Sequence, residues 1–124
     1  MASQKKILIV EDEADLVELT EKILQRHGYQ TVSCLDGSSA FKLVLQEKPD
    51  LVILDLTLPG KTGHEICAEI KSDPRSKNIP VLMTTGQQAD DENLGDPQSR
   101  PNDILKKPFE IDDLLKKVAN LLGK

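Results

Sequence analysis

Short runs of apolar residues alternate along the chain with stretches in which apolar residues recur at helical spacing. Most of the short runs are continuous and rich in branched side chains, which is typical of strands that are buried on both faces. They predict five strands, at residues 6–10, 30–34, 50–55, 78–84 and 103–106. Because strands and helices alternate, the sequence predicts a doubly wound α/β fold on a five-stranded parallel sheet.

Helices are predicted between the strands and after the last one. The first, at residues 13–27, places Leu16, Leu19 and Ile23 on one apolar stripe, and Gly28 ends it. The second is capped by Asp36 and ends before Pro49. The third and the last helix are predicted at residues 64–72 and 110–122.

One segment does not fit the alternation. Residues 86–102 (GQQADDENLGDPQSRPN) lie where a further helix, the fourth of five, is expected, but the segment is rich in Gly, Pro and acidic residues. Such a composition supports at most a turn or two around residues 90–94, followed by irregular chain. We therefore expect a weak or irregular fourth helix.

Composition narrows the class of protein. The 124 residues are enough for a single domain, residues 1–124, and the formal net charge of −5 disfavours direct binding to nucleic acid or to anionic lipid. Apolar runs of four residues are too short for a transmembrane helix or a signal peptide. Two cysteines, Cys34 and Cys67, lie far apart without a metal-binding motif, which is typical of a reduced, cytoplasmic protein.

Polar residues gather where the predicted strands end. The first strand leads into Glu11 and Asp12, the third ends in Asp55, and the later strands lead into Thr85 and Lys107. Ligands of open parallel sheets bind at this edge, and clustered carboxylates repel one another unless a cation lies between them. An all-oxygen site suits Mg²⁺, and a lysine and a hydroxyl nearby suit an anion. Together these groups indicate phosphoryl transfer, with a carboxylate available as the nucleophile.

Four motifs carry a resemblance to a known family. They are ILIVEDE at 7–13, DLVILDLTLPGKTG at 50–63, PVLMTTG at 80–86 and KKPF at 106–109. In this order and at these strand ends, they resemble the receiver domain of bacterial two-component response regulators, and the resemblance covers the whole chain. It implies the flavodoxin-like (CheY-like) version of the doubly wound fold.

The resemblance implies a role for each polar residue at this edge. Asp55 corresponds to the aspartate that accepts a phosphoryl group. Glu11 and Asp12 correspond to the acidic pair that holds Mg²⁺, together with Asp55 and the backbone carbonyl of Thr57. Thr85 corresponds to the hydroxyl that binds the phosphoryl oxygens.

Two further residues, Lys107 and Gly63, correspond to family residues near the phosphorylation site. Lys107 corresponds to the lysine that pairs with the phosphoaspartate, and in the family the bond to the following proline, here Pro108, is usually cis. Gly63 corresponds to the glycine after the phosphorylation loop. The implied function is a phosphoacceptor receiver domain that catalyses only its own phosphorylation and dephosphorylation, and is not otherwise an enzyme.

The resemblance also implies the partners. A sensor histidine kinase or a histidine phosphotransfer protein would supply the phosphoryl group, and a downstream protein or a missing output domain would receive the signal. We expect a monomer when the protein is unphosphorylated, with no nucleic-acid or membrane partner.

One position and one segment depart from the family pattern. Ile104 occupies the place of an aromatic residue whose rotamer usually reports activation, so the usual coupling to Thr85 cannot operate. The segment at 87–102 lacks the usual apolar stripe of the fourth helix. Since that helix contributes to the common dimer surface of the family, we expect this protein not to form the standard dimer there.

Three alternatives are compatible with parts of the same sequence. Glu11 and Asp12 alone could be ordinary acids at a helix N-terminus. A haloacid-dehalogenase-type phosphatase also uses a strand-end aspartate with Mg²⁺, but it needs a second acid two residues later, where this chain has Thr57. The remaining alternative is a degenerate receiver that acts as a phosphorylation-independent protein-binding module, and Ile104 and the unusual segment at 87–102 are the reasons to consider it.

Overall fold

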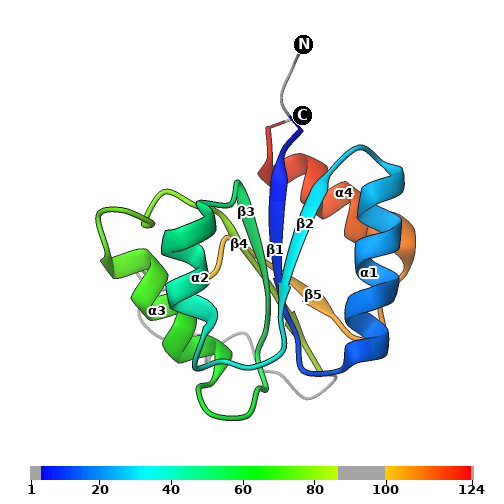
Figure 1. Cartoon of the computed structure of the whole chain (residues 1–124). Helices are drawn as coiled ribbons and strands as arrows, with labels where there is room; N and C mark the ends of the chain where they lie inside the picture. Colours follow the sequence, from blue (N-terminus) through cyan, green and yellow to red (C-terminus); the bar gives the residue numbers. More distant parts are fainter. Residues whose placement is uncertain (1–3, 87–99, 124) are drawn as a thin grey trace.

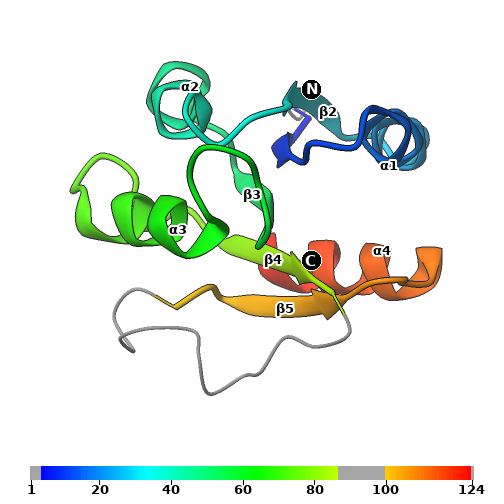
Figure 2. The same ribbon diagram turned by 90° about the horizontal axis from the view of Figure 1, so that it is seen from below.

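The computed structural model describes residues 4–86 and 100–123, and these form a three-layer α/β sandwich (Figures 1 and 2). All strand pairs of the central sheet are parallel, and the strand order is β2-β1-β3-β4-β5. The elements are β1 (Lys6–Val10), α1 (Ala14–Arg26), β2 (Gln30–Cys34), α2 (Ala40–Glu47), β3 (Leu51–Asp55), α3 (Gly63–Ser72), β4 (Val81–Thr85), β5 (Asp103–Lys106) and α4 (Ile111–Leu121). The predicted doubly wound fold is therefore confirmed.

The two faces of the sheet carry separate cores. Helices α2 and α3 cover one face, and α1 and α4 cover the other (Figure 2). Successive residues of a strand point to opposite faces, so in β1 Leu8 belongs to the core under α2 and α3 while Ile7 and Ile9 belong to the core under α1 and α4. Because both faces are covered, the central strands are apolar along their whole length, as the sequence pattern indicated.

Two elements, β4 and α2, start more than one residue from their predicted positions. β4 begins at Val81 and not at residue 78, because Pro80 has no N–H to donate and the N–H of Ile79 already donates to the carbonyl of Ser76 at 2.9 Å. Asp36 does not cap α2: the N-cap position belongs to Ser39, and the Asp36 carboxylate accepts the Ser39 N–H at 2.9 Å in the turn before the helix.

The predicted apolar stripe of α1 is only partly buried. Ile23 is in the core, but Leu19 is 52% exposed. Leu19 lines a groove of about 390 Å³ between α1 and the segment that follows β5, together with Phe109 and Ile111. Helical spacing identified the apolar side of the helix, but it could not show that the facing segment leaves part of that side uncovered.

Three other predictions concern the segment between β4 and β5, membrane-spanning helices and the cysteines. The weak helix between β4 and β5 was predicted within residues 86–102, and most of that segment lies outside the described residues. In the described part of the chain, no helix combines the length and the apolar character needed to cross a membrane. Cys34 and Cys67 are both buried and form no disulfide.

Candidate functional site

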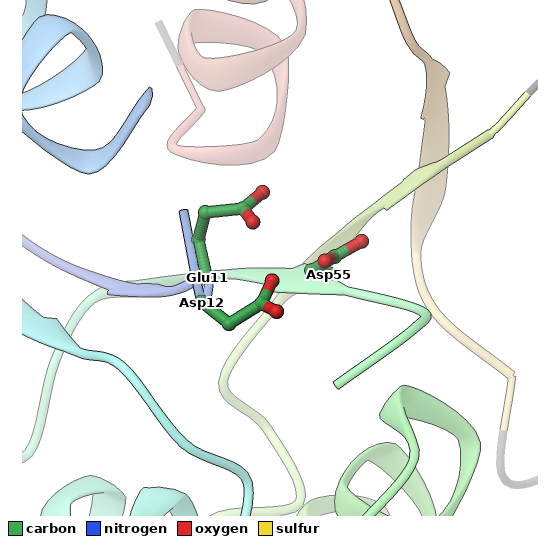
Figure 3. Close-up of side chains that lie close together, drawn as sticks. All are labelled: Glu11, Asp12 and Asp55. Carbon is green, nitrogen blue, oxygen red and sulfur yellow. The ribbon is translucent and has the colours of Figure 1, made fainter. Parts of the chain in front are cut away.

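The carboxyl edge of the sheet brings three acidic side chains together. Glu11 and Asp12 follow the end of β1, and Asp55 is the last residue of the neighbouring strand β3 (Figure 3). Each residue offers a carboxylate oxygen, and these oxygens lie within 4.8 Å of one another. Glu11 and Asp55 are 4% and 5% exposed, whereas Asp12 is open to solvent. The cluster therefore has a buried floor and one accessible side.

Lys107, which follows the outer strand β5, completes this cluster at the same carboxyl edge of the sheet. Its ammonium nitrogen lies 2.6 Å from Glu11 Oε1 and 3.3 Å from Asp55 Oδ1. The lysine follows β5 directly, and its N–H donates to the carbonyl of Thr85 at 2.6 Å, so the end of β4 holds its backbone. The peptide bond from Lys107 to Pro108 is cis, as the resemblance implied.

Burial and charge shift the ionisation of two of these groups. Burial raises the pKa of Glu11, and the nearby charge of Asp55 acts in the same direction, while the hydrogen bonds from Lys107 and from the Glu13 N–H only partly offset this. Burial alone would lower the pKa of Lys107, but its hydrogen bond to Glu11 and the charge of Asp55 outweigh burial and raise it. Lys107 is therefore a permanent cation at neutral pH, held between two carboxylates.

Thr85 is the last residue of β4, one position beyond the residue that pairs with Asp55. Its side chain is fully buried, and its hydroxyl has no hydrogen-bond partner among the described residues. Thr84, the alternative hydroxyl in the sequence, faces the opposite side of the sheet, toward Ile53 and Phe109. A buried hydroxyl without a partner is uncommon and indicates a group kept available for another contact.

The loop between β3 and α3 is tightly packed beneath Asp55. The N–H of Thr57 donates to Asp55 Oδ1 at 3.4 Å, and the N–H of Gly63 donates to the carbonyl of Leu56 at 2.8 Å. A Cβ on Gly63 would lie 2.5 Å from the carbonyl oxygen of Asp55, so only glycine lets the start of α3 approach the end of β3 this closely. The role predicted for the Thr57 carbonyl remains a prediction.

The donor set of the cluster fits a magnesium ion. Three carboxylates and a single ammonium group leave an excess of negative charge, and the donors are all oxygen. The exposed side at Asp12 leaves room for the water molecules that Mg²⁺ usually retains. Zinc would favour His or Cys donors, and neither residue type belongs to this cluster.

Sequence reasoning missed two features of the site. It assigned Lys107 to an incoming anion and did not predict its short contact with Glu11, because the two residues are 96 positions apart. It also missed the contact between neighbouring loops, where the N–H of Gly37 donates to the carbonyl of Pro59 at 3.4 Å. Gly37 in the sequence DGSS is an ordinary turn signal, so only the structure shows that it contacts the loop after β3.

Both the sequence and the structure of the chain resemble known proteins. A family model for the response regulator receiver domain matches residues 7–119. A solved structure described as a response regulator from Chloroflexus aurantiacus J-10-fl is 31% identical, with a TM-score of 0.90, over 98% of this chain and 100% of that one. The chemotaxis response regulator CheY4 of Vibrio cholerae is 25% identical, with a TM-score of 0.88, over 96% of this chain and 99% of that chain.

A third solved structure shares the fold. The receiver domain of the sensor histidine kinase PA1611 from Pseudomonas aeruginosa PAO1 is 24% identical, with a TM-score of 0.87, over 98% of this chain and 100% of that chain. That structure has a magnesium ion coordinated in its active-site cleft.

Proposed function

The chain belongs to the response regulator receiver domain family, and from this we propose that it accepts a phosphoryl group on Asp55 and thereby switches a protein interaction. The observation that carries the proposal is the joint position of Asp55, two further acids and Lys107 at one edge of the sheet. A structural role would not require three carboxylates in mutual repulsion, whereas magnesium-dependent phosphoryl transfer does.

Glu11, Asp12 and Asp55 would hold Mg²⁺, with the carbonyl of Thr57 as a further ligand. When bound, the ion neutralises negative charge on the transferring phosphoryl group. The Pseudomonas receiver domain with magnesium in its cleft supports this assignment by analogy of fold. The match between the oxygen donors of this chain and the preferences of Mg²⁺ supports it independently.

Asp55 would act as the nucleophile. One carboxylate oxygen attacks the phosphorus of a phosphohistidine on a kinase or phosphotransfer protein; the P–N bond breaks, a P–O bond forms, and the donor histidine leaves as imidazole. The Thr57 N–H, which already donates to Asp55 Oδ1 at 3.4 Å, helps to orient the carboxylate. The product is an acyl phosphate on Asp55.

Lys107 and Thr85 would bind the new phosphoryl group. Lys107 lies 3.3 Å from Asp55 Oδ1, which is close enough for its ammonium to contact oxygens attached to that carboxylate. The buried hydroxyl of Thr85 can donate to a phosphoryl oxygen, and such a contact would move the end of β4. We propose that this movement is the switch, and that the protein catalyses no reaction on an external substrate.

Incubation with Mg²⁺ and a small acyl phosphate, followed by intact mass measurement, tests this function. We expect one phosphoryl adduct that requires Mg²⁺ and is absent from the Asp55→Asn variant. No adduct under conditions that label an established receiver domain would refute phosphoacceptance, and would favour the phosphorylation-independent binding module.

A further inference from the structure

The loop that carries Thr57 joins β3 to α3 and spans residues 56–62. Its far end is fixed by the capping box of α3, in which Thr62 Oγ1 accepts the Glu65 N–H at 3.2 Å and the Glu65 carboxylate accepts the Thr62 N–H at 3.3 Å. Between these ends, Leu58 is buried in the core, and this apolar contact holds the loop without fixing its direction.

The remaining part of the loop has few directional contacts. The Gly37 N–H reaches the carbonyl of Pro59 only at 3.4 Å, which is a weak hydrogen bond. The main chain of Lys61 passes close to Gly37, since a Cβ on that glycine would lie 2.5 Å from the Lys61 carbonyl oxygen. Neither contact fixes the loop as firmly as a short charged hydrogen bond does.

Lys61 provides such a contact. Its ammonium nitrogen lies 2.7 Å from Oε2 of Glu69, which is on the second turn of α3. The second oxygen of that carboxylate, Oε1, is buried and has no hydrogen-bond partner among the described residues. Glu69 therefore depends on Lys61 for the compensation of its charge, and any displacement of Lys61 leaves a partly buried carboxylate without a partner.

We propose that Lys61 and Glu69 form a latch that positions the loop after β3 and, through it, the backbone of Thr57 at the metal and phosphoryl site. The Lys61–Glu69 latch rests on the proposed function, because the site it serves is the one assigned there. Both are positioning residues, because they act through the loop and contact neither Asp55 nor the other two acids. The side chains are 37% and 34% exposed, so they are accessible to substitution without opening the core.

The latch is testable, because a purely electrostatic effect of the pair and a role in holding the loop predict different changes in Mg²⁺ affinity. If Lys61 acted only through its charge, Lys61→Met would leave extra negative charge near the acids and tighten Mg²⁺ binding, whereas Glu69→Gln would weaken it. If the pair acts by holding the loop, both variants weaken binding. We expect both to raise the Kd for Mg²⁺ about tenfold, the low end of the range for residues that orient metal ligands.

The experiment measures the Kd for Mg²⁺ from amide chemical shifts, with amide hydrogen exchange in the metal-free protein as a second readout. Lys61→Met and Glu69→Gln should speed exchange within residues 57–61, the double variant should bind no more weakly than either single variant, and Lys61→Arg should restore wild-type affinity. Lys6→Met is the matched control, since Lys6 forms a 3.3 Å pair with Glu47 at similar exposure but at the opposite edge of the sheet.

Three results would overturn the latch. Wild-type affinity in both single variants would show that the pair is an ordinary surface ion pair, and changes of opposite sign would show an effect of charge alone. Both of these results leave the proposed function intact. Absence of Mg²⁺ binding in the wild-type protein would instead remove the proposed function and the latch with it.

Discussion

Replacement of Asp55 by Asn should stabilise the metal-free protein, although it removes the central residue of the site. Asp55 lies within 4.8 Å of the carboxylate oxygens of Glu11 and Asp12, and its Oδ1 lies 3.3 Å from the ammonium of Lys107. With each oxygen pair placed at the 4.8 Å limit and an effective dielectric constant of about 20, each repulsion amounts to about 3.5 kcal/mol and the attraction to about 5 kcal/mol. The two repulsions together exceed the attraction by about 2 kcal/mol, so loss of the Asp55 charge raises the free energy of unfolding by about that amount.

Removal of the positive charge from the cluster should instead lower the free energy of unfolding. Lys107→Met removes the only ammonium in contact with the cluster among the described residues and leaves three carboxylates together. We expect a loss of about 3 kcal/mol, as is typical when one partner of a buried ion pair is removed.

Urea denaturation followed by circular dichroism, at low salt with a chelator, measures both changes. Glu18→Gln is the control for net charge, because Glu18 forms an exposed pair with Lys22, and it should change stability by less than about 1 kcal/mol. Addition of Mg²⁺ should stabilise the wild type more than Asp55→Asn, since only the wild type has the full set of ligands. An Asp55→Asn protein that is less stable than the wild type in chelator would refute the argument that repulsion dominates the cluster.

Three further predictions concern the packing around the site. Leu24→Ala should lower the free energy of unfolding by about 3 kcal/mol because Leu24 is fully buried. Leu19→Ala in the same helix should lower it by less than about 1 kcal/mol, because Leu19 is half exposed. Equal losses in urea denaturation would contradict the exposed position of Leu19. Gly63→Ala should destabilise the protein by about 3 kcal/mol, because its Cβ would lie 2.5 Å from backbone that the helix cannot avoid, and unchanged thermal stability would disprove this close approach. Burial raises the pKa of Cys67 to about 11, so between pH 9 and 11 only the unfolded state loses this proton. The free energy of unfolding should therefore fall by about 2–3 kcal/mol over that range. Cys67→Ala, measured in parallel, should lack this part of the decrease.

The sequence predicted the central strands well because they are buried on both faces. β1, with the sequence KILIV, ends at the predicted residue, since the apolar run gives way there to Glu11 and Asp12, which belong to the acidic cluster and not to the apolar core. The start of β4 was less accurate, because the apolar pattern continues through Ile79, whereas the hydrogen bonding does not. Periodicity reports burial, and strand boundaries also depend on which N–H groups are free to pair.

The residues of the site could be predicted from the sequence, but the contacts between their side chains could not. Strand-end positions gave Glu11, Asp12 and Asp55 as one cluster, because parallel strands bring their carboxyl ends to the same edge of the sheet. Contacts that depend on the course of long side chains, such as that of Lys107 with Glu11 or Lys61 with Glu69, leave no trace in residue spacing. The fully buried, unpartnered hydroxyl of Thr85 likewise became visible only once its surroundings were known.

The measurement that tests the central claim most directly is the location of the phosphoryl group. Protein treated with Mg²⁺ and a small acyl phosphate can be reduced with borohydride, which converts a phosphorylated aspartate to homoserine, and then digested for peptide mass spectrometry. We predict homoserine at position 55 alone, and none when Mg²⁺ is omitted. Homoserine at Asp12 instead, or an unmodified Asp55 in protein that carries phosphate elsewhere, would contradict the assignment of Asp55 as the phosphoacceptor.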